Sequence, residues 1–377
     1  MVSATVIITV LTQIEALEGV LRPVMYAAWA GTSASALILS KFRVKPSGFT
    51  LWFALAYVIW LLLCGVLSLM GFEHLNGRYL GAMIIPLLMT VTADMTRKLF
   101  DHDELIRLCK VYALAAAAYA LYVQINYFAS YTSWLSSHVY AFQDKNSAAQ
   151  IWCSAVLCIV YMIRPRGLRE KLLWYGLAAF MLLVVGFSQC RTALLALAIV
   201  LAAHVMLYSK HKLRWLIGVG VTAALLLAIP FTRRFISQML LLEKYAGADL
   251  NTLSSGRIGK YIRALEYFVQ SPFIGTGRYY VDCSYLMVLT EGGILGFLLI
   301  ESIWGCRAAI NLKSWRTQWR LPAMLTVFYF GESLLEGFPP FGPGVSAFFF
   351  WLMSGYLHTE KQKRQRITGA RRLRRTH

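Results

Sequence analysis

Residues 172–208 decide the fold class, and they read LLWYGLAAFMLLVVGFSQCRTALLALAIVLAAHVMLY. Arg191 is the only Asp, Glu, Lys or Arg residue of this stretch, and each half approaches the length that a helix needs to cross hydrocarbon. The whole chain shares this character, because 58% of its 377 residues are apolar and only 15% are charged. Soluble domains are about 45–50% apolar and about 25% charged. The sequence therefore predicts an integral membrane protein and excludes a soluble enzyme, a secreted disulfide scaffold and a disordered chain.

Apolar stretches of similar length recur along the chain, so the sequence predicts an all-α integral membrane protein with about 12 transmembrane helices. The expected spans are 4–20, 24–40, 50–71, 79–93, 110–130, 147–163, 172–187, 192–208, 213–231, 284–305, 321–336 and 343–358. The predicted domains are 1–231 with helices 1 to 9, 232–283 as one large periplasmic loop with short helices, 284–358 with helices 10 to 12, and 359–377 as a basic cytoplasmic tail. Glu15 and Glu18 interrupt the first span, which nevertheless lacks the features of a signal peptide.

The distribution of basic residues predicts the orientation, because lysine and arginine are retained on the cytoplasmic side of a membrane. With the N-terminus inside, 26 of the 37 Lys and Arg residues fall in cytoplasmic connections or in the tail, so both termini are expected in the cytoplasm. The net charge of +19 does not indicate a nucleic-acid partner, because it accompanies long uncharged apolar runs. The basic residues on the cytoplasmic side are suited to contact anionic membrane lipids.

The connection 232–283 is the only long loop, and it holds seven of the 11 basic residues on the outer side. Positive charge there opposes the topological bias, so it predicts an anionic ligand. Ser254 or Ser255 can cap an amphipathic helix over 258–270, whose free N–H groups would favour an anion. Gly275 and Gly277 allow either a tight turn or a close backbone approach to a ligand. The basic residues expected at the anion are Arg257, Arg263, Arg278 and, on a face that could equally be solvated, Lys260.

Two further features lie on the predicted outer face. Arg191 sits between two spans with almost no loop, and an arginine at the membrane boundary is costly unless it is paired. We expect it to face a cavity that holds a charged ligand, the alternative being a side chain that extends to lipid phosphate. Glu332 and Glu336 are spaced i to i+4 and so share one helix face, either for function or for a salt bridge to Arg191 or another buried arginine.

Four short motifs resemble those of the O-antigen ligase and O-antigen polymerase superfamily, whose members make bacterial envelope glycans. Their order and spacing also match along most of the chain. The motifs are Asp144-Lys145-Asn146, the stretch 188–194 with Arg191, Ser255-Gly256-Arg257 followed by 271–277, and 289–296, which reads LTEGGILG.

The resemblance implies a multi-pass protein that transfers a glycan from undecaprenyl diphosphate at the periplasmic face of the bacterial inner membrane. The acceptor is lipid A-core in ligases and another lipid-linked repeat unit in polymerases. Arg191 and Arg257 correspond to arginines of the family. We therefore expect an O-antigen ligase of lipopolysaccharide biosynthesis, with a polysaccharide polymerase as the alternative. The residues expected to be catalytic are Arg191, Arg257, Asp282 and Glu336, and those expected to bind substrate are Lys260, Arg263, Arg278 and Glu332.

The chain departs from the ligase pattern at one point. Ligases typically carry a histidine just before the segment 289–296, whereas this chain reads Tyr280-Val281-Asp282-Cys283-Ser284-Tyr285. Asp282 could therefore act as the base or orient the acceptor. The sequence Asp282-Cys283-Ser284-Tyr285 also looks like that of the polymerase branch. His74 and His138 are the histidines of the outer face, far along the chain.

Neither a cofactor nor a metal is expected. Fixed guanidinium groups can neutralise a diphosphate leaving group, and no group of His, Asp or Glu with ligand spacing occurs on the outer face. The seven cysteines show no Cys-x-x-Cys spacing. A transporter of lipid-linked sugars is the hypothesis from another class, but the chain lacks an inverted repeat and gathers its outer charge on one loop.

Overall fold

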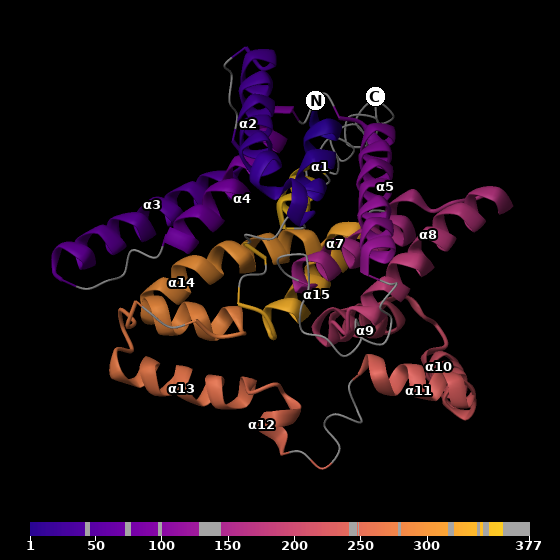
Figure 1. The fold of residues 1–377 in the computed structure, drawn as a ribbon. Helices are drawn as coiled ribbons and strands as arrows, with labels where there is room; N and C mark the ends of the chain where they lie inside the picture. The colour runs from indigo at the N-terminus through magenta and orange to yellow at the C-terminus, as the bar shows by residue number, and fades with distance from the viewer. Residues whose placement is uncertain are drawn as a thin grey trace, which may run out of the picture.

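The structure is a computed structural model in which every regular element of the described residues is a helix (Figure 1). It describes residues 1–41, 46–71, 77–96, 100–127, 145–240, 247, 249–277, 280–315, 320–337, 340–341 and 347–356. The helices are α1 Val2–Leu11, α2 Glu15–Leu39, α3 Gly48–Leu69, α4 Gly77–Thr96, α5 His102–Tyr127, α7 Lys145–Cys158, the π-helix η2 Ile159–Ile163, α8 Leu168–Phe187, α9 Arg191–Tyr208, α10 Lys212–Ala228, α11 Pro230–Met239, α12 Leu250–Leu253, α13 Arg257–Gln270, α14 Ser284–Leu312, α15 Leu321–Ser333, and a last helix Ala347–Tyr356. The predicted all-α class is thus confirmed for this part of the chain.

Six of the described helices are long and apolar enough to cross a membrane, or seven if the bent pair α10 and α11 forms one span. The expected count of about 12 is not confirmed, because α1, the apolar part of α4 and the last helix are shorter than a bilayer requires. The expected first span, 4–20, is interrupted. Its polar Thr12 and Gln13 lie between α1 and α2, and the Thr12 hydroxyl bonds to the Thr9 carbonyl at 2.7 Å.

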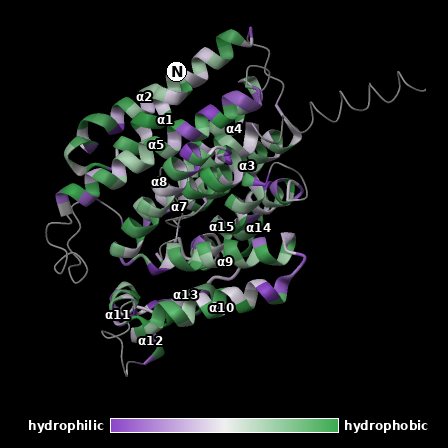
Figure 2. Ribbon diagram, turned by 90° about the vertical axis from the view of Figure 1, so that its right-hand side faces the viewer, coloured by the Kyte–Doolittle hydropathy of each residue, from purple (hydrophilic) through white to green (hydrophobic). Residues whose placement is uncertain are grey.

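Helix α7 lies at the centre of the bundle, where it packs against α5, α8, α9 and α15. From Ala148 to Cys158 every residue of α7 is buried, whereas α3 and α8 expose many leucines. Figure 2 shows apolar residues along most helices of the bundle, on outward surfaces as well. An apolar exterior around a buried central helix is the arrangement expected for a protein surrounded by lipid.

Helix α14 is not a single straight span as the sequence predicted. Its Gly293 has φ 59° and ψ −162°, which breaks the helix into 284–292 and 294–312. The two parts lie side by side (Figure 1), so that Tyr285 and Glu301 interact electrostatically. A straight helix would hold these residues about 24 Å apart. The chain therefore doubles back at Gly293.

The segment 271–277 occupies the break in α14. In an intact helix the N–H groups of Ile294 and Leu295 would donate to the carbonyls of Thr290 and Glu291. Here Ile294 and Leu295 donate instead to the carbonyls of Pro272 and Phe273, at 2.8 and 3.2 Å. The freed carbonyls of Thr290 and Glu291 accept from Thr276 and Gly277, at 2.8 and 3.1 Å. The inserted segment thus satisfies the backbone groups that the break exposes, which a membrane environment demands.

Two glycines make this insertion possible. A Cβ atom on Gly275 would lie 2.4 Å from the Glu291 carbonyl oxygen, and one on Gly293 would lie 2.4 Å from the backbone of Phe273. Both glycines also have positive φ. The sequence left open whether Gly275 closes a turn or approaches a ligand, and the structure shows it against the chain's own backbone.

Candidate functional site

The residues expected to be functional meet where α7, α9, α13 and α15 come together with the start of α14. At the centre, the Arg257 side chain extends from the first residue of α13 toward the Glu336 carboxylate. We call this group the Arg257 cluster, and its members are Asn146, Thr192, Arg257, Lys260, Asp282 and Glu336. They come from three helices and two connections, so only the folded chain brings them together.

The start of α13 is set by the turn that ends α12. Gly256 donates to the Asn251 carbonyl at 2.7 Å and Ser255 to the Thr252 carbonyl at 2.9 Å, which is the hydrogen-bond pattern of a Schellman motif. Ser255 and Gly256 both have positive φ, at 58° and 79°. The turn therefore places Arg257 at the first position of α13.

The first turn of α13 does not offer free N–H groups to an anion. The Ser254 hydroxyl accepts from Ile258 at 3.3 Å, as the sequence predicted for a capping serine. The Asn251 side chain accepts from Gly259 at 2.8 Å, and Lys260 donates to the Gly256 carbonyl. The expectation of an anion at these N–H groups is thus wrong, because neighbouring residues already accept from them. Any anion must be bound by the side chains.

Arg257 is held between two carboxylates. Its Nη2 donates to Glu336 Oε1 at 2.9 Å, its Nη1 donates to the Thr192 hydroxyl at 3.3 Å, and its Nε lies 3.9 Å from Asp282 Oδ2. The guanidinium side chain keeps 21% of its surface exposed, while that of Glu336 keeps 11%. These contacts fix the plane of the guanidinium, and the side chain remains partly exposed.

Lys260 and Tyr261 join α13 to the residues before α14. Lys260 Nζ pairs with Asp282 Oδ2 at 2.8 Å, and the Tyr261 hydroxyl, with one proton to donate, lies 2.7 and 3.1 Å from the carbonyl oxygens of Asp282 and Leu334. Burial raises the pKa of Tyr261 to about 12, so its hydroxyl stays protonated and keeps donating at physiological pH. Asp282 therefore shares its carboxylate with Lys260 and Arg257 rather than standing alone.

Arg191 contacts different groups from those that Arg257 contacts. Its Nη1 donates to the Leu253 carbonyl at 3.1 Å and its Nη2 to the Ser255 hydroxyl at 2.7 Å. These bonds join the start of α9 to the turn that precedes Arg257. Arg191 thus contacts the loop where the sequence predicted a charged ligand.

Glu332 and Glu336 share one face, as their spacing predicted. Glu336 donates its N–H to the Glu332 carbonyl at 2.8 Å, which continues the helical turn beyond the end of α15. Glu332 is fully buried and accepts from Gln150 at 3.2 Å. Glu336 forms the expected salt bridge, and its partner is Arg257 rather than Arg191.

Arg263 lies outside the Arg257 cluster. Arg263 is exposed on α13 and forms no ion pair with another described residue. Arg278, Asp144, His74 and His138 lie outside the described residues.

Sequence reasoning gave no role to four residues of this region, namely Asn146, Gln150, Thr192 and Tyr261. Two of them belong to motifs that carry the family resemblance, since Asn146 is the last residue of 144–146 and Thr192 lies in 188–194. Among the described residues, no group of three or more His, Cys, Asp or Glu side chains is arranged to hold a metal ion.

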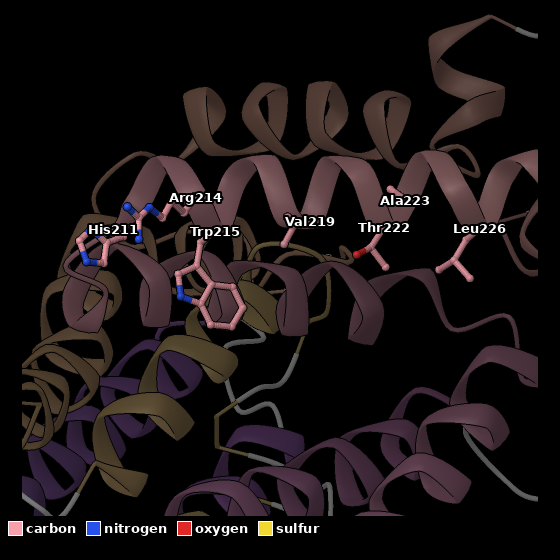
Figure 3. A pocket seen from close by; sticks show the side chains of 8 residues that line it. His211, Arg214, Trp215, Val219, Thr222, Ala223 and Leu226 are labelled. Atoms are coloured by element: carbon pink, nitrogen blue, oxygen red, sulfur yellow. The ribbon is translucent and has the colours of Figure 1, made fainter.

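A groove of about 680 Å³ runs along α10, away from this cluster (Figure 3). His211, Arg214 and Trp215 lie at one end of it, and Val219, Ala223 and Leu226 continue it as an apolar surface. No residue of the Arg257 cluster lines this groove. It is therefore separate from the candidate site.

A family model described as O-antigen ligase matches residues 176–300, from α8 into α14. The match confirms the predicted resemblance to the O-antigen ligase and polymerase superfamily, and it contains Arg191, Arg257, Lys260 and Asp282. Asn146 and Glu336 lie outside the matched segment. No curated protein matches the chain.

Proposed function

We propose, from the match of residues 176–300 to the O-antigen ligase family, that this protein transfers a polysaccharide from undecaprenyl diphosphate to lipid A-core. The reaction takes place at the periplasmic face of the bacterial inner membrane and serves lipopolysaccharide biosynthesis. The observation that supports it most is the Arg257 guanidinium, partly exposed and held in one plane by Glu336 and Thr192. A diphosphate is the kind of anion that such a planar group binds best.

The proposed membrane arrangement follows the charge distribution. Twelve spans with both termini in the cytoplasm place 232–283 as the periplasmic loop, and α13 then carries Arg257 on the periplasmic side. The donor tail and the acceptor lipid both reach the site laterally from the bilayer. Arg263 and Arg278 remain proposed helpers for the longer glycan.

The chemistry assigned to the cluster is charge neutralisation followed by proton removal. As the glycosidic bond breaks, negative charge develops on the diphosphate, and Arg257 and Lys260 stabilise it electrostatically. The same two side chains hold Asp282 in the absence of donor. A bound diphosphate competes for them, so it releases the Asp282 carboxylate to accept the proton of the acceptor hydroxyl.

Glu336 is a positioning residue in this scheme. One of its oxygens accepts from Arg257, Thr192 and Asn146, at 2.9, 3.1 and 2.9 Å. Three donors on one oxygen stabilise the ionised form and make this carboxylate a poor base. Asp282 is therefore the better candidate for the base.

A polymerase that joins lipid-linked repeat units is the second candidate. Asp282 favours it, because this acidic residue stands where ligases typically carry a histidine. The two reactions share the donor and differ in the acceptor, so the Arg257 cluster serves either.

The test is the envelope glycan of a strain that lacks the gene. For a ligase, we expect long chains to remain on undecaprenyl diphosphate while lipid A-core stays bare on a lipopolysaccharide gel. Lipid A-core that carries a single repeat unit would identify a polymerase instead. An unchanged glycan pattern would contradict both.

The same strain tests the site. Arg257→Ala should fail to restore the glycan at wild-type protein level, because the diphosphate loses its main ligand. Arg234→Ala is the matched control, since Arg234 is an exposed arginine of α11 without an ion pair to another described residue. Restoration by Arg257→Ala would remove Arg257 from the mechanism.

A further inference from the structure

Two pairs of side chains connect α7 to the end of α15 in matching register. On α7, Asn146 and Gln150 are four residues apart. At the end of α15, Glu332 and Glu336 have the same spacing. Asn146 Nδ2 donates to Glu336 at 2.9 Å, and Gln150 Nε2 donates to Glu332 at 3.2 Å. Each amide thus donates to one carboxylate, and the two pairs, Asn146–Glu336 and Gln150–Glu332, connect the two segments.

The Asn146–Glu336 pair is part of the Arg257 cluster. Glu336 Oε1 accepts from Asn146 on α7 and from Arg257 on α13 at the same distance of 2.9 Å. Asn146 and Arg257 therefore donate to the same carboxylate oxygen from two different helices. A shift of Glu336 toward α7 or away from it would change the direction of the guanidinium.

Asn146 is itself held in one orientation. Its Oδ1 accepts from the Cys190 thiol at 3.1 Å, which leaves the amide nitrogen directed at Glu336. Burial, and next the Glu332 carboxylate, raise the pKa of Cys190, so the thiol stays protonated and keeps donating. The donor direction of the Asn146 amide is thus determined by a second hydrogen bond.

We propose that Asn146 is a positioning residue for the transfer reaction, because its amide places the Glu336 carboxylate that aims Arg257 at the donor. The inference rests on the proposed function for its chemistry, but Asn146 and Glu336 both lie outside the matched family segment. It also assigns a role to the motif at 144–146, which the mechanism above does not use.

Replacing the amide by a carboxyl group gives a distinctive result. In Asn146→Asp two carboxyl groups face each other at hydrogen-bond distance, and they cannot both ionise there without repulsion. The charged groups around the pair are Arg257 from α13, Asp282 before α14, Glu332 from α15 and Lys145 from the start of α7, which acts on neighbouring Cys190. With one shared proton the pair keeps the hydrogen bond, and without it Glu336 is pushed away.

The pH dependence follows from this shared proton. Because repulsion raises the pKa of the pair in the folded variant, the geometry is kept below that raised pKa and is lost as the pH rises through it. We expect the ratio of wild-type to Asn146→Asp activity to increase at least tenfold between pH 6 and pH 8.5. Asn146→Ala should lose activity by a factor that does not change with pH, because it lacks the second carboxyl group.

The experiment measures glycan transfer from a polyprenyl-diphosphate-linked donor by the full-length protein in proteoliposomes, together with thermal unfolding over the same pH range. Asn126→Asp is the matched control, since Asn126 is an exposed asparagine on α5 whose amide donates to the Tyr122 carbonyl at 2.8 Å. Its activity ratio to wild type should stay constant. A constant ratio for Asn146→Asp as well would overturn the proposal, whatever its unfolding temperature.

Failure of the proposed function gives a different pattern. In that case the wild-type protein transfers nothing from any diphosphate-linked donor. If the unfolding temperature of Asn146→Asp still falls as the pH rises, Asn146 positions Glu336 and Arg257 for another ligand. If it stays level with that of Asn126→Asp, the positioning role is overturned too.

Discussion

Two arginines of the matched segment differ in what their guanidinium groups hold. Arg257 contacts two carboxylates and one hydroxyl, whereas Arg191 donates to a backbone carbonyl and the Ser255 hydroxyl. The first set of contacts needs a planar group with several donors, because the partners lie in different directions. The second set needs two donors aimed at one turn.

Lysine substitutions should therefore have unequal effects. We expect Arg257→Lys to lower kcat/KM by roughly 100-fold, equivalent to about 2.7 kcal/mol, because an ammonium cannot replace the planar contacts. Arg191→Lys should cost no more than roughly 10-fold, since an ammonium can still donate to Leu253 and Ser255. The measurement is steady-state transfer in proteoliposomes at matched protein levels. Equal losses at both positions would contradict separate roles.

At this scale the sequence predicted part of the site. It identified Arg191, Arg257 and Glu336 from charge and spacing, and Asp282 from the family resemblance, and all of them lie in or beside the cluster. It gave Asn146 no role because an amide carries no charge pattern, and its partner Glu336 is 190 residues away. It also placed Arg263 with Arg257, although the helix turns Arg263 to an exposed position.

Among the elements, the break in α14 is the one on which the site depends. The segment 271–277 lies in the break, and Asp282 follows it by five residues in the sequence. The four backbone hydrogen bonds of this insertion therefore restrict where Asp282 can stand relative to Lys260 and Arg257.

Alanine at either glycine of this insertion should destabilise the protein. Gly275→Ala and Gly293→Ala each add a methyl group that clashes with neighbouring backbone atoms, at a residue with positive φ. We therefore expect the free energy of unfolding to fall by about 3 kcal/mol or more, and the amount of protein in the membrane to fall as well. The control is Gly305→Ala, where nothing lies within 4 Å of the added Cβ. There alanine favours the helix by about 1 kcal/mol. Thermal unfolding in detergent compares the three, and wild-type stability of Gly275→Ala would argue against the insertion.

The sequence showed both parts of this unit but not their union. The motifs at 271–277 and 289–296 were visible as separate glycine-containing pieces, and 284–305 looked like an ordinary span. Apolar composition reports burial in lipid and cannot report a break whose hydrogen bonds come from another segment.

For the whole molecule, the charge distribution predicts a direction across the membrane. The end of α13 should be periplasmic and the connection between α9 and α10 cytoplasmic. Each of these two regions has an exposed residue suitable for labelling. These residues are Gln270 at the end of α13 and His211 between α9 and α10. Cys306 is the one exposed cysteine of the seven, so it must be replaced first.

We therefore expect Gln270→Cys, in a Cys306→Ser background, to react with a membrane-impermeant maleimide at the periplasmic surface. His211→Cys in the same background should react only after the membrane is permeabilised. The measurement is the labelled fraction in spheroplasts before and after detergent. The reverse pattern would invert the proposed orientation and place the Arg257 cluster in the cytoplasm.

The attachment of α13 at both ends has a kinetic consequence. Its first residue follows a turn that Arg191 ties to α9, and the segment after its last residue is bonded into α14. A hinged cover would have to break six hydrogen bonds in each cycle, which makes such an opening slow compared with side-chain motion. In the proposed transfer, α13 should therefore stay in place as a fixed wall throughout turnover, and the substrates should enter and leave between neighbouring helices and not beneath a moving cover.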